Sequence, residues 1–256
     1  MPTTQHFLAD MFSLTGRRAL VTGGSSGIGR AIAVALAAAG AHVVVAARTR
    51  ETIDATVAEI ERNGGAAEGV VADLAARSGA HALANAAGDV DILVNSAGIN
   101  LRPPFAELGE DTWDATMAVN LDAPFVLGQR LAPGMAERGH GRIIHISSQQ
   151  AQRPFAASGA YGVSKAALEA LARSQAEAWS PRGVTANVLV PGFVQTPLNQ
   201  RLSSNPETVA ALAARTLIGR NGVPQDFAAP AVFLAGAGSA YVTGQTIPVD
   251  GGFSVH

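Results

Sequence analysis

Tyr161 and Lys165 stand four residues apart, so on a helix they share one face. Ser148 lies thirteen positions before Tyr161, directly after the Ile-rich run of residues 142–147. Transfer of a hydride to a ketone builds negative charge on the carbonyl oxygen, which then needs a proton donor and hydrogen bonds. The pKa of a free tyrosine is about 10, and a neighbouring ammonium lowers it. The set therefore predicts Tyr161 as general acid and base, with Lys165 as the charge that lowers its pKa. The alternative is a packed tyrosine beside a solvated lysine.

The segment of residues 22–29, TGGSSGIG, is a glycine-rich turn between an apolar run and an Ala-rich stretch of helical length. At this position in a doubly wound sheet, backbone N–H groups and the helix dipole point at the ligand, and a pyrophosphate suits both. Gly23 allows the tight turn, Gly27 lets the backbone approach the ligand, and Gly29 lets the helix pack on the strand. An ordinary strand-to-helix turn is the alternative. The predicted dinucleotide contacts here are Gly23, Ser25, Ser26, Gly27, Ile28 and Gly29.

The end of the next strand indicates which dinucleotide the site prefers. In NAD-binding sheets an acidic residue about twenty positions past the glycines binds the ribose 2′-hydroxyl, whereas an arginine accommodates a 2′-phosphate. Here the strand ends in Arg48, Thr49 and Arg50, and no acid precedes Glu51. We therefore expect NADP(H), with Arg48 as the phosphate partner. NAD(H) is the alternative, in which Arg48 and Arg50 are solvated side chains at the start of a helix.

Short Val-, Ile- and Leu-rich runs alternate with Ala-rich stretches, a pattern typical of a parallel sheet with helices on both faces. The expected fold is α/β, a doubly wound Rossmann fold with seven parallel strands, in one catalytic domain over residues 1–256. The strands are expected at residues 18–22, 42–46, 66–72, 91–95, 142–147, 185–190 and 246–249. The helices are expected at residues 27–39, 51–63, 75–87, 111–138, 158–179 and 225–235. This order places Ser148 and the glycine turn at carboxyl ends of strands, where such sheets bind ligands.

Residues 191–222 do not fit the alternation. They carry two X-Pro breaks, at Pro197 and Pro206, around polar residues and a short Ala-rich helix. A segment this long outside the sheet is more often a functional lid than an idle loop. We expect it to close over a substrate.

Together these features resemble the short-chain dehydrogenase/reductase family over roughly residues 14–253. Besides the glycine turn and the Tyr-x-x-x-Lys pair, the matching pieces are Asp73, residues 95–98, Asn120, Ser148, residues 191–192 and residues 249–252. One departure is visible, because residues 95–98 read Asn-Ser-Ala-Gly where the family usually has Asn-Asn-Ala-Gly. A serine can still form a hydrogen bond at that position.

The resemblance implies a catalytic tetrad of Asn120, Ser148, Tyr161 and Lys165. In this tetrad Ser148 bonds the substrate oxygen, Lys165 also holds the nicotinamide ribose, and Asn120 holds a water that relays protons to Lys165. Asp73 is implied near the adenine, and Asn95 is implied to fix the central sheet and the cofactor. The further cofactor contacts implied are Leu74, Ala97, Gly98, Pro191, Gly192, Val194 and Thr196.

Substrate choice is expected to depend on side chains after the strand ends and on the lid. The candidates are Arg102, Gln149, Arg153, Phe155 and Phe193. Their polarity, and a similarity to gluconate 5-dehydrogenase-like members of the family, favour a sugar acid or polyol, with Arg102 or Arg153 facing a carboxylate. Either arginine could instead lie in solvent or in a subunit contact. Two other readings stay open: a reductase of 3-oxoacyl thioesters on acyl-carrier protein or CoA, and a catalytically silent dinucleotide-binding regulator.

Composition excludes several other classes. The 256 residues include no cysteine and only six scattered histidines, so no disulfide, iron–sulfur cluster or metal site is expected. A net charge of −2 and the absence of a Lys/Arg run argue against nucleic acid as a partner. The first 18 residues lack a basic, apolar leader, and no apolar run is long enough for a membrane span, which predicts a cytoplasmic protein. The resemblance implies a homo-oligomer, a tetramer or a dimer.

Overall fold

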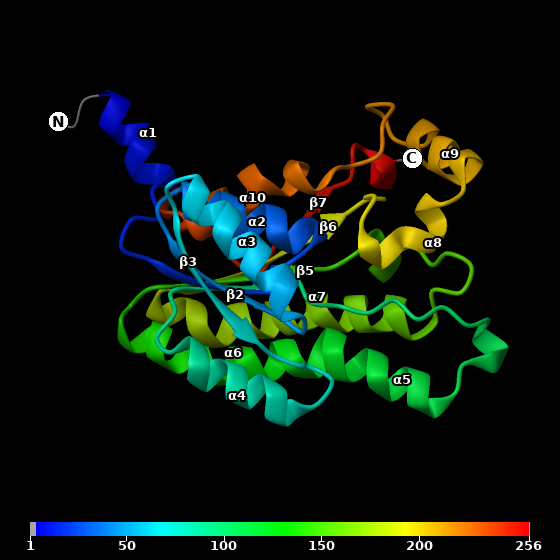
Figure 1. The fold of residues 1–256 in the computed structure, drawn as a ribbon, viewed down its shortest axis with the longest axis horizontal. Helices are drawn as coiled ribbons and strands as arrows, with labels where there is room; N and C mark the ends of the chain where they lie inside the picture. The colour runs from blue at the N-terminus through cyan, green and yellow to red at the C-terminus, as the bar shows by residue number, and fades with distance from the viewer. Residues whose placement is uncertain (1–3, 256) are drawn as a thin grey trace.

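A computed structural model describes residues 4–255, and its centre is a single seven-stranded parallel sheet (Figure 1). The strand order is β3-β2-β1-β4-β5-β6-β7. The strands are β1 (Arg18–Thr22), β2 (His42–Ala47), β3 (Ala66–Val71), β4 (Ile92–Asn95), β5 (Gly141–Ile146), β6 (Val184–Pro191) and β7 (Thr246–Val249). Each strand lies within one residue of its predicted ends, and the doubly wound α/β fold is confirmed. Residues 1–3 and 256 lie outside the described range. Residues 1–3 belong to the N-terminal 18 residues in which no leader is expected.

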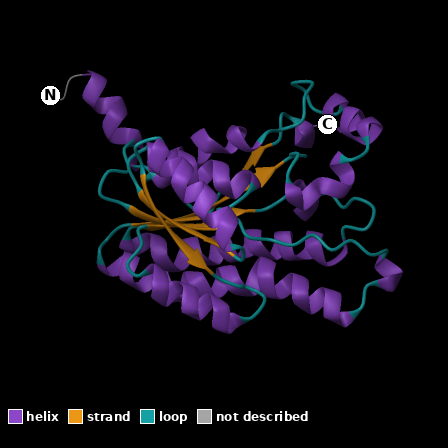
Figure 2. Cartoon of the chain, viewed as in Figure 1, coloured by secondary structure: helices purple, strands orange, loops and turns teal. Residues whose placement is uncertain are grey.

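Helices cover both faces of this sheet (Figure 2). One face carries α2 (Gly27–Ala38), α3 (Arg50–Arg62) and α10 (Ala228–Ala235). The other carries α4 (Arg77–Ala87), α5 (Glu110–Met117), α6 (Ala123–Glu137) and α7 (Gly159–Trp179). An additional helix, α1 (Thr4–Phe12), extends from the body and was not predicted. Among residues 4–255, none of the helices combines the length and the apolar character that crossing a bilayer requires.

Two helices begin later than predicted because local hydrogen bonds compete for their first residues. The Asp73 carboxylate accepts the Ala75 N–H at 3.0 Å, an Asx turn, and α4 starts only after it. A 3-10 turn (Pro224–Phe227) similarly precedes α10. Both differences lie outside the sheet and leave the strand ends unchanged.

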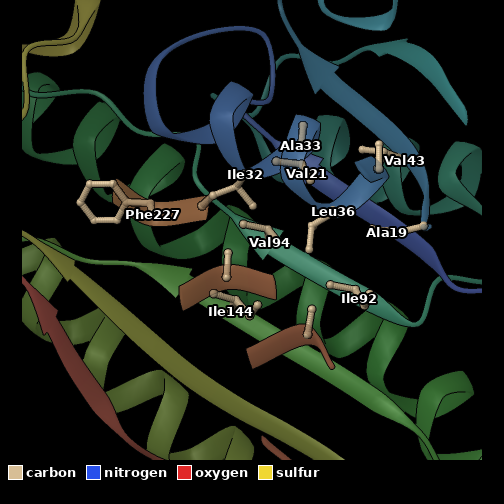
Figure 3. Close-up of a cluster of buried hydrophobic side chains, with 14 of the residues drawn as sticks. Ala19, Val21, Ile32, Ala33, Leu36, Val43, Ile92, Val94, Ile144 and Phe227 are labelled. Atoms are coloured by element: carbon tan, nitrogen blue, oxygen red, sulfur yellow. The ribbon is translucent and has the colours of Figure 1, made fainter. Parts of the chain in front are cut away.

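Alternate side chains of β1 enter opposite halves of the core. Ala19 and Val21 pack with Ile32 and Leu36 of α2 (Figure 3), whereas Leu20 belongs to the cluster under α4 and α6. Burial on both faces explains why the strands read as continuous apolar runs. Each fully buried Leu or Ile stabilises the fold by roughly 1.5–3 kcal/mol. The sheet is therefore a rigid frame for the loops at its ends.

The single helix predicted at residues 111–138 is interrupted by a π turn at Ala118–Asp122. The Ala123 N–H bonds the Ala118 carbonyl five residues back, so the turn holds one residue more than an α-helical turn. Asn120, in the middle of the π turn, is completely buried. One inserted residue barely disturbs the hydrophobic period, which is why the sequence did not reveal the interruption.

Residues 191–222 fold into a 3-10 turn (Pro197–Asn199), α8 (Gln200–Ser203) and α9 (Pro206–Ala214). The Asn205 side chain caps α9 by accepting the N–H groups of Glu207 at 2.9 Å and Thr208 at 3.1 Å. A parallel bridge between Val194 and Gly222 joins the two ends of the segment. The Ala-rich helix expected there is α9, whereas the single turn α8 has no periodic pattern that could predict it.

Candidate active site

A cavity of about 610 Å³ opens at the carboxyl ends of the central strands. This is the edge at which the strand order reverses between β1 and β4, the usual ligand position in such sheets. Many of the predicted site residues line it. They are Gly23, Ser26, Gly27, Ile28, Gly29, Ala97, Gly98, Arg102, Ser148, Gln149, Phe155, Tyr161, Lys165, Pro191, Gly192, Phe193, Val194 and Thr196.

The remaining predicted residues do not line this cavity. They are Ser25, Arg48, Asp73, Leu74, Asn95, Asn120 and Arg153. Asn95 and Asn120 are buried behind its wall, and Asp73 lines a smaller cavity beside α4. The lid contributes cavity residues that the sequence did not single out, Arg201 above all.

The glycine turn depends on missing side chains. Gly23 and Gly27 have φ angles of +65° and +51°, in the left-handed region. A Cβ on Gly23 would lie 2.9 Å from the Ala97 Cα, and one on Gly29 would lie 2.3 Å from the Gly23 carbonyl oxygen. The N-terminus of α2 faces the cavity, and the Ser26 hydroxyl makes no capping bond there. These groups fit the pyrophosphate of a dinucleotide.

Arg48 follows the end of β2, and its side chain is exposed. The ion pairs found among residues 4–255 do not include Arg48, whereas Arg50 pairs with Asp54 at 3.4 Å. Arg48 is thus an exposed cation at the carboxyl end of β2, without an acidic partner in the described chain. That charge fits a phosphate group beyond the glycine turn.

Tyr161 and Lys165 are buried on the first turns of α7. Lys165 Nζ lies 5.7 Å from the centre of the Tyr161 ring and donates a hydrogen bond to the Ile146 carbonyl at 2.8 Å. Burial raises the pKa of Tyr161, while a hydrogen bond with Ser148 and then the charge of Arg102 lower it. Burial also lowers the pKa of Lys165 to about 8.

The effect expected of Lys165, a lowered pKa of Tyr161, stays a prediction. Burial raises this pKa, while the hydrogen bond with Ser148 and the charge of Arg102, a second cation near the phenol, lower it. The Lys165 ammonium is directed to a strand carbonyl and is itself desolvated.

Ser148 is the second residue after β5, and its hydroxyl has two hydrogen-bond partners. Its hydroxyl accepts the Gln150 N–H at 3.2 Å and forms the hydrogen bond with Tyr161. The preceding Ser147 donates to the buried Glu169 of α7 at 2.9 Å. The strand end and the Tyr161 helix are therefore tied together next to the cavity.

Asn120 ties the loop after β4 to α7. Its Nδ2 donates to the Ile99 carbonyl and to the Ser164 hydroxyl, both at 3.0 Å, and its Oδ1 accepts the Ile99 N–H at 2.9 Å. A Cβ on Gly98 would lie 3.3 Å from this Oδ1 and 3.6 Å from Lys165 Nζ. Both amide hydrogens are thus used by the protein, and the oxygen faces the same point as the ammonium.

Asn95 begins a buried polar chain through the sheet. Its Nδ2 lies 3.2 Å from His145 Nδ1, and His145 Nε2 lies 2.7 Å from Gln175 Oε1. Because an amide oxygen only accepts, Nε2 carries the proton and Nδ1 accepts from Asn95. Burial lowers the pKa of His145 to about 4, so the ring is neutral near pH 7. Asn95 thereby links β4, β5 and α7 behind the cavity.

The family described as Enoyl-(Acyl carrier protein) reductase matches residues 23–254. A gluconate 5-dehydrogenase from Gluconobacter oxydans (strain 621H) is 38% identical over 250 residues, 96% of this chain and 98% of the relative. The chain belongs to the short-chain dehydrogenase/reductase family. It is an NAD(P)-dependent oxidoreductase that acts on alcohol and carbonyl groups.

Two solved members of the family share its whole architecture. The gluconate 5-dehydrogenase from Burkholderia cenocepacia J2315, in complex with NADP and tartrate, has a TM-score of 0.92 at 38% identity and covers 97% of this chain and 99% of its own. The 3-oxoacyl (acyl-carrier-protein) reductase from Agrobacterium tumefaciens C58, with NADP bound, has a TM-score of 0.93 at 34% identity and covers 98% of this chain and 100% of its own. Overall similarity therefore does not distinguish these two substrate classes. The residues that line the cavity have to distinguish them.

Two arginines face the cavity of this short-chain dehydrogenase/reductase. Arg102 donates to the carbonyls of Ala156 at 2.7 Å and Ala157 at 3.4 Å, and Arg201 reaches the cavity from α8. Burial and then the charge of Arg201 lower the pKa of Arg102. None of the ion pairs among residues 4–255 includes either arginine. Two cations that repel each other beside Tyr161 are an arrangement that an anionic ligand stabilises.

Arg153, the other arginine expected near a substrate carboxylate, is directed elsewhere. Its Nη2 donates to the Ser254 carbonyl at 2.6 Å, and it does not line the cavity. The reason is the C-terminal turn, which packs against the loop that carries Arg153. Phe155 of that loop does line the cavity.

Proposed function

We propose that this enzyme interconverts a secondary alcohol and a ketone on a polyhydroxylated acid, with NADP(H) as hydride carrier. The observation that carries the proposal is the pair of arginines, Arg102 and Arg201, that face the same cavity as Ser148 and Tyr161 without acidic partners in the described chain. A substrate carboxylate between them would relieve their repulsion and place the adjoining hydroxyl groups over the phenol.

In the direction of reduction, Tyr161 donates its proton to the substrate oxygen while the Ser148 hydroxyl bonds the same oxygen. A bound NADPH would supply the hydride to the carbonyl carbon, so the products would be the alcohol, the oxidised cofactor and a tyrosinate. Arg102 then stabilises that tyrosinate, in keeping with its effect on the pKa of Tyr161. Lys165 holds the nicotinamide ribose and returns a proton, with Asn120 and a water completing the relay. In oxidation the same groups act in reverse.

The preference for NADP(H) rests on Arg48, which would pair with the 2′-phosphate. Ser25 and Ser26 would join the glycine turn around the phosphates. Asp73 and Leu74 would contact the adenine. The loops with Asn95, Ala97 and Gly98 and with Pro191, Gly192, Val194 and Thr196 would enclose the nicotinamide half. The two solved relatives named above contain NADP, which supports this assignment.

The segment of residues 191–222 would act as the lid of this site. Its residues Leu202, Thr208 and Leu212 line the cavity, so their movement would change its volume. Gln149 and Phe155 would contact the substrate from the loop after β5, and Phe193 would contact it from the lid segment itself. We further propose a cytoplasmic homo-oligomer, for which the partly exposed Trp113, Phe125 and Val163 on α5, α6 and α7 supply an apolar surface.

The test is a substrate panel followed through the absorbance of the reduced nicotinamide, with both cofactors. We expect 5-ketogluconate or gluconate to be turned over with NADP(H), and acetoacetyl thioesters to be poor substrates. Efficient turnover of acetoacetyl thioesters, and none of sugar acids, would replace the proposal with the 3-oxoacyl reductase. No turnover of any member, with NADPH still bound, would favour a dinucleotide-binding regulator.

A further inference from the structure

The C-terminal turn, residues 250–255, ends beside the lid helices (Figure 1). The Asp250 carboxylate accepts the N–H groups of Gly252 at 3.0 Å and Ser254 at 2.8 Å, which fixes the turn. Phe253 at its centre is only 1% exposed, although it lies close to the end of the chain. A terminal aromatic side chain that is this deeply buried must have partners from other segments.

One partner is the loop after β5, residues 149–158, which we call the substrate loop. The ring centres of Phe253 and Phe155 lie 6.1 Å apart with the planes tilted by 45°. Arg153 of the same loop donates to the Ser254 carbonyl. Ala157 in this loop has a φ angle of +57°, which an L-residue adopts only when its surroundings hold it there.

The other partner is the end of the lid. Arg215, the residue that ends α9, places its guanidinium carbon 4.2 Å from the centre of the Phe253 ring. The Ile218 N–H bonds the Gly251 carbonyl at 3.2 Å. A Cβ on Gly252 would lie 2.7 Å from Leu217 Cδ1, so the two segments pack without space between them. Phe253 thus contacts a cavity-lining residue on one side and the end of the lid on the other.

We propose that Phe253 is a positioning residue that couples the substrate loop to the lid, so that the two walls of the cavity take up their closed arrangement together. Ser148 follows β5, Tyr161 and Lys165 lie on α7 and Asn120 lies in the π turn, so we expect the coupling to set substrate affinity and leave the chemical step unchanged. This role rests on the proposed function only in that these walls hold the substrate.

The decisive test is hydrogen exchange of the full-length protein without substrate, comparing the wild type with Arg215→Ala. Arg215 is exposed and stacks on the Phe253 ring, so its loss should leave the fold intact. We expect amides of residues 149–158, which contact Phe253 through Phe155, to exchange roughly twofold to fivefold faster, the range expected for a lost cation–π contact at an exposed site. Faster exchange confined to the neighbourhood of residue 215 would overturn the proposal.

A matched control is Arg182→Ala, because Arg182 also stacks on an aromatic ring, that of Trp179, at 4.5 Å but far from the cavity. It should leave exchange in residues 149–158 unchanged. Phe253→Leu should reproduce the effect of Arg215→Ala, and Phe253→Tyr should restore wild-type exchange by keeping the ring. If Phe253→Leu fails to fold, the Arg215 variant alone decides.

Kinetics add a second readout. With the best substrate of the panel, Arg215→Ala should raise KM severalfold while kcat and the Kd of NADPH stay at wild-type values. A fall in kcat with an unchanged KM would contradict a positioning role. If no sugar acid is turned over, the proposed function fails, yet the exchange experiment still tests the coupling.

Discussion

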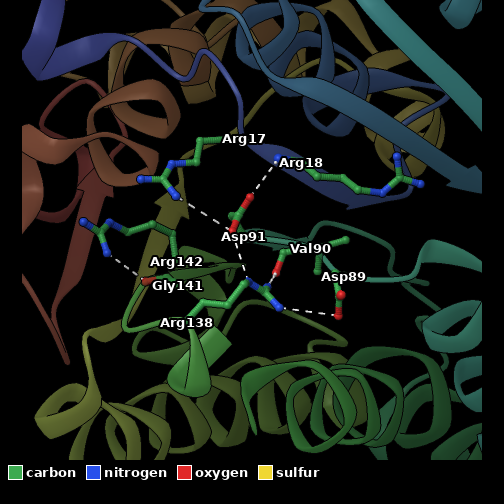
Figure 4. Close-up of polar contacts among 8 residues, drawn as sticks. All are labelled: Arg17, Arg18, Asp89, Val90, Asp91, Arg138, Gly141 and Arg142. Carbon is green, nitrogen blue, oxygen red and sulfur yellow. Dashed lines mark hydrogen bonds and ion pairs between the residues drawn. The ribbon is translucent and has the colours of Figure 1, made fainter. Parts of the chain in front are cut away.

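At the amino ends of the strands, arginines gather around an acid. Asp91 accepts the Arg18 N–H at 3.1 Å and lies 3.6 Å from Arg138 Nε and 3.9 Å from Arg17 Nη1 (Figure 4). Arg142 has no carboxylate partner there within the described residues, but it donates to the carbonyls of Gly141 and Gly236. This amino edge is internally neutralised or hydrogen-bonded.

At the carboxyl ends of the same strands, Arg102 and Arg201 face a cavity and lack acidic partners within residues 4–255. The same residue type thus serves two purposes in one sheet. Arginines with carboxylate partners stabilise the fold, and we propose that the two beside the cavity are left to bind a ligand. Changes at the amino edge should therefore affect stability without affecting catalysis, and changes at the carboxyl edge should do the reverse.

The largest effect is expected at the carboxyl edge from Tyr161→Phe. Losing the proton donor should lower kcat by about a thousandfold, within the range for general acid–base groups. The Kd of NADPH and the melting temperature should stay near the wild-type values. Turnover of a true substrate that survives the change would remove Tyr161 from its proposed role.

Lowering the pH should reduce the free energy of unfolding through the protonation of His145. Burial lowers the pKa of His145 in the folded state from 6.5 to about 4. Between these pH values the imidazole is therefore protonated in the unfolded chain and neutral in the folded chain. Its contribution is therefore intact above pH 6.5 and is lost as the pH falls toward 4, by up to about 3 kcal/mol. Thermal unfolding at a series of pH values should show a shallower acid slope for His145→Asn than for the wild type. The exposed His81→Asn should keep the wild-type slope, and equal slopes in all three proteins would contradict the assignment.

At the amino edge, Asp91→Asn should destabilise the fold by about 2 kcal/mol, because the partly exposed guanidinium groups of Arg17 and Arg138 lose their shared carboxylate. Urea unfolding measures this change, and kcat/KM should be unchanged. The control is Asp89→Asn, whose side chain is 91% exposed and pairs with Arg138 alone at 3.4 Å. If the Asp91 variant loses activity at full stability, the division between the two edges is wrong.

The cofactor preference offers the smallest predicted effect. Arg48→Asp should raise the Kd of NADPH at least about tenfold, since a charge-assisted hydrogen bond is lost and a repulsion is added. The Kd of NADH should change much less. Arg62→Asp, an exposed change of equal charge at the far end of α3, serves as control. Equal weakening of both cofactors by Arg48→Asp would count against the 2′-phosphate role.

Much of this architecture could be predicted from the sequence, because strands that are buried on both faces form continuous apolar runs. Gly23, Gly27, Gly29, Ser148 and Tyr161 line one cavity because carboxyl ends of parallel strands meet at one edge. That convergence is a property of the topology and needs no side-chain detail.

What the sequence did not reveal depends on contacts between distant segments. Arg153 bonds a carbonyl 101 residues further along the chain, and Arg201 lies on a helix too short to show a period. The pKa of Tyr161 depends on its burial and on Arg102, 59 positions earlier in the chain, and not on the nearby Lys165 alone. Local spacing cannot encode such contacts.

The central claim is that unpaired cations at the carboxyl edge select an acidic substrate. Its most direct measurement is the ratio of kcat/KM for 5-ketogluconate to that for a neutral ketose, in the wild type and in Arg201→Met. We predict that the ratio falls about tenfold, the factor for one lost charge-assisted bond, while the exposed Arg173→Met leaves it unchanged. An Arg201→Met enzyme that retains the wild-type ratio would contradict the account.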